Sequence, residues 1–150
     1  MKKILPIIIA LVAFSGIANA QISIKKSDVG RARQVATLAM YWSWIYQIDS
    51  TYYLVMKSDN QFDDSYWLRI GETKDECIGS LNSLKELAQT ITDSDRFEID
   101  NGEHITFIAT QYKSMGIKGV KFQGRGHAGI GYILPSNLDK AIKWIEKNVN

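Results

Sequence analysis

Cysteine and histidine are scarce in this chain of 150 residues, which holds one cysteine, Cys77, and two histidines, His104 and His127. A single cysteine excludes an internal disulfide, so the core alone must hold the fold. Cys77 shares a predicted helix face with Leu81 and Leu84, which favours a small buried side chain over a reactive thiol. No cysteine or carboxylate stands at metal-ligand spacing from either histidine, so we expect no metal and no cofactor.

Long apolar runs are absent after the first twenty residues, MKKILPIIIALVAFSGIANA. Two lysines, an apolar run and the small-residue triplet Ala18-Asn19-Ala20 follow one another there, which is the layout of a secretory signal peptide. The run is shorter than the roughly 18 residues that a membrane-spanning helix needs. We therefore predict a signal peptide over 1–20, a mature chain over 21–150 and export to the periplasm or the extracellular space. An uncleaved anchor is the alternative.

Net charge is also lacking once residues 1–20 are removed. The whole chain has 18 basic and 16 acidic residues, and the two lysines lost with the signal leave 16 of each sign. Nothing in this balance favours nucleic acid as a partner. The charges are uneven, however, since residues 49–103 are mostly acidic and residues 104–150 mostly basic. Two interpretations stay open: two solvated faces that attract each other, or a polarised surface that orients a partner.

Alternating and helical patterns predict one α+β domain over residues 21–150. Segments rich in aromatic and β-branched residues predict strands at 37–49, 51–58 and 65–72, and then at 96–100, 103–112, 119–123 and 128–134. Apolar stripes predict helices over about 73–91, with a capping box at Thr73, and over about 136–149. Short connections make the strands antiparallel. We expect an antiparallel sheet with both helices on one face, and a possible βββα–ββββα pseudo-repeat.

The stretch GRGHAG, Gly124 to Gly129, matches the dinucleotide fingerprint G-x-G-x-x-G. That fingerprint binds a pyrophosphate only where a strand leads into a helix. The next residues, IGYIL, predict a strand instead. We therefore interpret the glycines as a hairpin near Gly124–Gly126, in which Val120 and Phe122 cover Gly129 and Gly131 across the strands.

Catalytic and metal signatures are weak. Asp59, Asp63 and Asp64 lie in one polar loop, but their spacing is not that of an EF-hand, and a solvated turn is the preferred interpretation over a calcium site. No serine stands in G-x-S-x-G. An exported hydrolase-type enzyme, using His104 or His127 with a loop carboxylate, is the alternative function.

Aromatic residues are concentrated between Tyr41 and Trp67, which include eight of the eleven Trp and Tyr residues. A two-residue turn at Asp49-Ser50 would set Trp44 opposite Val55 and Tyr46 opposite Tyr53, on a face covered by the helices. The opposite, open face would present the candidate partner-binding residues Tyr41, Tyr52, Met56, Trp67 and Arg69. Aromatic, Met and Arg side chains are enriched at protein contacts. The sequence thus predicts a secreted, non-catalytic module that binds a protein or a glycan through this face. Coverage of the face by residues 21–35 or by self-association is the alternative.

The predicted signal peptide gives the first test. We expect the exported product to begin at Gln21, because cleavage follows the small-residue triplet. Mass spectrometry of the intact protein from the periplasm or the medium measures this directly. A product that retains residues 1–20 would contradict both the export prediction and the neutral charge balance.

Overall fold

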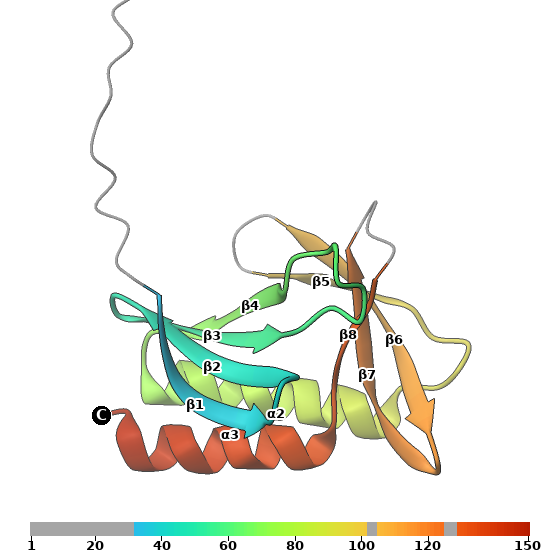
Figure 1. Ribbon diagram of the computed structural model, residues 1–150. Coiled ribbons are helices and arrows are strands. Elements are labelled where there is room, and N and C mark those ends of the chain that lie inside the picture. The colour runs from blue at the N-terminus through green and yellow to red at the C-terminus, as the bar shows by residue number, and fades with distance from the viewer. Residues whose placement is uncertain (1–31, 102–104, 125–128) are drawn as a thin grey trace, which may run out of the picture.

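The fold consists of two four-stranded antiparallel sheets and two helices, seen in a computed structural model that describes residues 32–101, 105–124 and 129–150 (Figure 1). The first sheet holds, in order, β1 (Arg33–Ala39), β2 (Ser43–Ile48), β3 (Thr51–Met56) and β4 (Tyr66–Gly71). The second holds β5 (Phe97–Asp100), β6 (Thr106–Ser114), β7 (Ile117–Gly124) and β8 (Gly131–Ile133). The helices are α2 (Lys74–Thr90) and α3 (Pro135–Asn148). The predicted α+β class and antiparallel pairing are confirmed, but the strands form two sheets and not the one sheet that was expected.

The segment 37–49, expected as one strand, is divided by a turn. β1 ends at Ala39 and β2 begins at Ser43, and the Trp42 amide donates to the Ala39 carbonyl (3.1 Å). Tyr41, between them, has a left-handed backbone with φ of 66°. Each half therefore has the order ββββα, one strand more than expected in the first half. The shared order of elements does not by itself confirm the expected pseudo-repeat.

The predicted register between β2 and β3 is confirmed, but the predicted core face is wrong. Trp44 pairs with Val55 and Tyr46 with Tyr53, as expected. The side chains of Ile45, Leu54 and Met56 are nevertheless the ones buried in the core. Aliphatic side chains pack against the helices, whereas Trp and Tyr carry polar groups that favour a partly wet surface.

Strand β4 explains the exchange of faces. Leu54 pairs with Leu68 and Met56 with Tyr66. The predicted open face, which set Met56 beside Trp67 and Arg69, required a register that differs by one residue. A shift of one residue moves a strand's side chains to the other face. Tyr66, Leu68 and Ile70 thus join the face of Leu54, and together they form the surface on which the helices pack.

Helices α2 and α3 lie side by side on the core face of the first sheet, and α2 also reaches β7 (Figure 1). Their stripes match the predicted ones and bury Cys77, Leu81, Leu84, Ala88, Leu138, Ala141 and Ile145. Thr73 caps α2, since its hydroxyl accepts from the Glu76 amide (3.4 Å). The Glu76 carboxylate accepts a hydrogen bond from the amide of Glu72 (2.9 Å), the residue before the cap. Both helices are thus placed as the sequence predicts.

Two connections of the second sheet are longer than a two-residue turn. Asp100 pairs with Thr106, so the β5–β6 connection covers 101–105, and Gly102 lies outside the described residues. Phe122 pairs with Gly131, so the β7–β8 connection begins after Gly124 and reaches Ile130. Phe122 and Gly131 are cross-strand partners, while Val120 faces Ile133 and not a glycine. The short turn near Gly124–Gly126 is not confirmed, and residues 125–128 lie outside the described residues.

The sheets approach each other closely at Gly131. A Cβ atom at Gly131 would lie 2.6 Å from Cδ2 of Tyr66 and 3.2 Å from Cβ of Met56. The Tyr66 ring cannot retreat, because it is buried and its hydroxyl donates to the Gly129 carbonyl (2.6 Å). The glycine is therefore required by space between the sheets.

We expect Gly131→Ala to lower the free energy of unfolding by about 1–3 kcal/mol, since the added methyl overpacks this contact. Denaturant titration followed by circular dichroism measures the change. Gly79→Ala is the matched control: nothing lies within 4 Å of a Cβ at that helical position, so alanine should raise stability by about 0.5–1 kcal/mol. Equal effects of the two substitutions would contradict the close approach.

Candidate functional site

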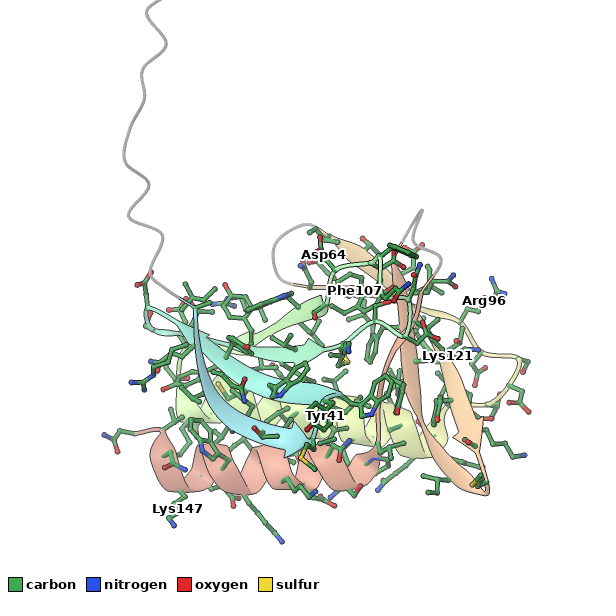
Figure 2. All side chains as sticks on the ribbon, in the orientation of Figure 1. Tyr41, Asp64, Arg96, Phe107, Lys121 and Lys147 are labelled. Atoms are coloured by element: carbon green, nitrogen blue, oxygen red, sulfur yellow. The ribbon has the colours of Figure 1, made fainter. Side chains whose placement is uncertain are left out.

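The five candidate partner-binding residues do not share one face. Met56 is fully buried in the core, and Tyr52 lies on that side, with its ring 6.3 Å from the Trp144 ring of α3. Trp67 and Arg69 project from the opposite face, because they pair with Val55 and Tyr53. Tyr41 is exposed at the β1–β2 turn (Figure 2). The prediction of one open face with all five is therefore wrong, and the register of β4 is the reason.

The outer face of the first sheet is covered by its own aromatic side chains. The Trp67 ring lies 5.0 Å from that of Tyr46 and 5.9 Å from that of Tyr53. Val55 and Tyr53 are buried, although both helices of the described residues pack on the other side. Arg69 is held in a 2.8 Å ion pair with Glu72, and that hydrogen bond raises the pKa of its guanidinium. This face is thus a closed aromatic layer, and residues other than these must supply an open surface.

Three aromatic rings from both sheets form a continuous row, which we call the aromatic strip: Trp42, Tyr112 and Tyr132. The Trp42 and Tyr132 ring centroids are 5.6 Å apart, and those of Tyr132 and Tyr112 are 4.5 Å apart with nearly parallel planes. Gly119 faces Tyr112 across the β6–β7 pairing. Because a Cβ at Gly119 would meet the backbone of Ile133, only glycine leaves room there, and an aromatic ring can cover it.

Two of the three rings of the aromatic strip, Tyr112 and Tyr132, lie in a segment without negative charge. Residues 105–138 contain no Asp or Glu, and Lys121 pairs directly with Tyr132. Burial raises the pKa of the Tyr132 phenol, and Tyr112 adds a smaller effect in the same direction. The phenol therefore stays protonated at neutral pH and keeps its hydrogen-bond donor.

A polar hollow of about 230 Å³ continues the outer surface of the second sheet beyond the aromatic strip. Its lining comes from the loop before β5, from β6 and from β7: Asp93, Arg96, Ile108, Thr110, Gln111, Lys121 and Gln123. Arg96 and Lys121 lie on this side of the molecule (Figure 2). This surface thus has aromatic rings at one end and polar side chains of both charges, Asp93 among them, at the other.

The β1–β2 turn exposes three consecutive side chains, Trp42 of the aromatic strip and the two residues before it. Met40, Tyr41 and Trp42 are 71%, 70% and 39% exposed. The turn is held by the Trp42–Ala39 hydrogen bond and by the Lys57 amide, which donates to the Trp42 carbonyl (2.9 Å). A left-handed backbone is uncommon for a residue as bulky as Tyr41. No glycine or asparagine marks this turn in the sequence, so the pattern gave no sign of it.

The end of the GRGHAG stretch binds carboxylates of the same chain. The Gly129 amide donates to Asp63 (2.7 Å) and the Ile130 amide to Asp59 (2.7 Å). Strand β8 follows, and α3 begins only at Pro135, so the strand that the sequence predicts after Gly129 is confirmed. These two amides are therefore used to dock the 59–64 loop.

The remaining catalytic and metal hypotheses find no further support in the described residues. Asp59 and Asp63 accept hydrogen bonds from backbone amides, so the 59–64 loop is a docked turn and not merely a solvated one. Within residues 32–101, 105–124 and 129–150, no group of three or more His, Cys, Asp or Glu side chains could hold a metal ion. His104 and His127 lie outside these ranges, so the hydrolase hypothesis stays a prediction.

Among the described residues, no helix has both the length and the apolarity that crossing a bilayer requires. The comparisons with known proteins are negative, because no family model, curated protein or solved structure matches this chain.

Cys77 allows a chemical test of the core. It is fully buried, and desolvation raises the pKa of its thiol to about 11. The thiolate is the reactive form, so we expect negligible reaction with Ellman's reagent at pH 8 in the folded protein and one reacting thiol per chain in denaturant. A fast reaction of the native protein would contradict the buried position.

Proposed function

We propose that this chain is an exported, non-catalytic protein-interaction module whose contact surface is the aromatic strip together with Met40 and Tyr41. The observation that carries the proposal is the β1–β2 turn, where three large side chains in succession are exposed. The left-handed backbone at Tyr41 costs on the order of 1–3 kcal/mol at a residue of this kind. A strained turn that exposes apolar side chains has no benefit for folding, which supports a role in binding.

The aromatic strip gives this turn a rigid support. Trp42 packs on Tyr132, which stacks on Tyr112. Tyr and Trp side chains have few rotatable bonds, so ordering them on binding costs little entropy. Binding energy at protein interfaces is concentrated in such anchored aromatic residues. The surface therefore combines an exposed turn with a support that is already ordered in the free protein.

The stacking of the rings favours a protein over a glycan as the partner. A sugar stacks on an open ring face, whereas Tyr112 and Tyr132 turn a face toward each other. A protein partner can use ring edges and the phenol hydroxyls as well. The two lysines and the apolar run of residues 1–20 support export, which would bring this surface to partners outside the cytoplasm.

Site-specific photocrosslinking tests the proposal. With p-benzoylphenylalanine in place of Tyr41, we expect one discrete adduct with another polypeptide in the native cell envelope. In place of Phe97, which is 44% exposed on β5, the same group should give none. The double substitution Met40→Ser/Trp42→Ala should then weaken binding of the purified partner about tenfold, or about 1.4 kcal/mol, as measured by calorimetry.

The matched control is Phe97→Ala, which should leave the affinity unchanged. Three results would contradict the proposal: an adduct formed only with a second copy of the chain, equal loss of affinity in Phe97→Ala, or binding to a glycan array that depends on Trp42. The first would assign the surface to self-association and the last to a carbohydrate.

A further inference from the structure

The β6–β7 hairpin ends in an exposed apolar apex. Ser114 pairs with Ile117, so Met115 and Gly116 alone form the turn. Met115 is 99% exposed and Ile117 53% exposed. In Figure 1 this end of the hairpin projects beyond the ends of α2 and α3. The apex is therefore a convex protrusion whose methionine has no packing within the described protein.

The turn has an unfavourable residue at its first position. Both turn residues have left-handed backbones, with φ of 48° at Met115 and 80° at Gly116. Two-residue hairpin turns of this kind favour Asn-Gly or Asp-Gly, because asparagine and aspartate tolerate positive φ. Methionine lacks that tolerance, and at 99% exposure its side chain makes no packing contact that would offset the strain. Folding alone therefore does not account for Met115.

Two lysines flank the apex. Lys113 and Lys118 pair directly across the strands and are both exposed, and like charges at directly opposite positions are destabilising. Neither takes part in an ion pair within the described residues. Since residues 105–138 contain no acidic residue, the hairpin itself offers no carboxylate to neutralise them.

We propose that this apex docks onto the surface of an anionic lipid bilayer, with Met115 and Ile117 at the boundary of the acyl chains and Lys113 and Lys118 at the headgroup phosphates. The hairpin is apolar at its tip and positively charged just behind it, which matches the change from acyl chains to anionic headgroups at a bilayer interface. Lysine also lets its apolar stem lie at this depth while its ammonium group stays in the headgroup layer. The convex shape and the paired cations favour a lipid surface over an apolar groove of a protein. The proposal is independent of the aromatic strip.

Vesicle cosedimentation tests the proposal on protein purified from the exported fraction of cells that make the full chain. Vesicles of phosphatidylcholine alone are compared with equimolar phosphatidylcholine and phosphatidylglycerol. We expect binding about tenfold stronger to the anionic vesicles and weakened by salt. Met115→Asn/Ile117→Ser should reduce that binding about tenfold, while its melting temperature stays equal or rises, because Asn-Gly is a better turn.

A second variant and a control keep the test specific. Lys113→Gln/Lys118→Gln should abolish the preference for anionic vesicles. Phe62→Ser, which removes an 86% exposed side chain from the 59–64 loop, should bind like the wild type. The proposal is overturned if the wild type shows no preference for anionic vesicles, if the apex variant keeps its affinity, or if Phe62→Ser loses as much. Crosslinking of position 115 to a protein without vesicle binding would assign the apex to a protein partner and would also overturn it.

Discussion

The junction between the two sheets is the contact on which the rest of the structure depends. The segment between β3 and β4, together with Tyr66 at the start of β4, makes four hydrogen bonds to residues 129–130. Asp59 and Asp63 accept two of them through their carboxylates, the Asp59 amide donates the third and the Tyr66 hydroxyl the fourth. The bond from the Tyr66 hydroxyl is buried and the one between the Gly129 amide and Asp63 is partly buried, and a buried polar group without a partner costs about 1–3 kcal/mol. These two bonds therefore satisfy groups that the close approach of the sheets shields from water. A second link is the Arg69 amide, which donates to the carbonyl of the buried Asn101 (2.9 Å).

This junction also sets the geometry of the aromatic strip. The Lys57 amide binds the Trp42 carbonyl, and two residues later the Asp59 amide binds the Ile130 carbonyl. The segment 57–59 thus holds both the turn that carries Trp42 and Ile130, which lies two residues before Tyr132. The contact between these rings, which joins the first sheet to the second, follows from that common attachment. Preorganisation of this kind lowers the entropy cost of binding.

The sequence predicts well what is local and poorly what depends on the junction. The two helices and the β2–β3 register follow from apolar periodicity and from a turn at Asp49-Ser50. The core face could not be chosen, because both faces of β2 and β3 are apolar and the register of β4 decides between them. The aromatic strip joins residues distant in the chain, so no sequence window contains it. Of the candidate residues, Tyr41 alone lies beside the aromatic strip. Its exposure depends on the β1–β2 turn, which no glycine marks in the sequence.

Backbone strain distinguishes the two proposed surfaces from the rest of the fold. Among the described residues, Tyr41, Asp49 and Met115 are the non-glycine residues with positive φ. Asp49 forms the β2–β3 turn, and aspartate is a residue type that tolerates this conformation, so ordinary hairpin chemistry accounts for it. Tyr41 and Met115 lack that tolerance and are also strongly exposed. An asparagine would relieve the strain at either position and would remove an apolar group from water. That the two residues combine strain with exposure is a physical reason to connect both turns with contacts made outside the chain.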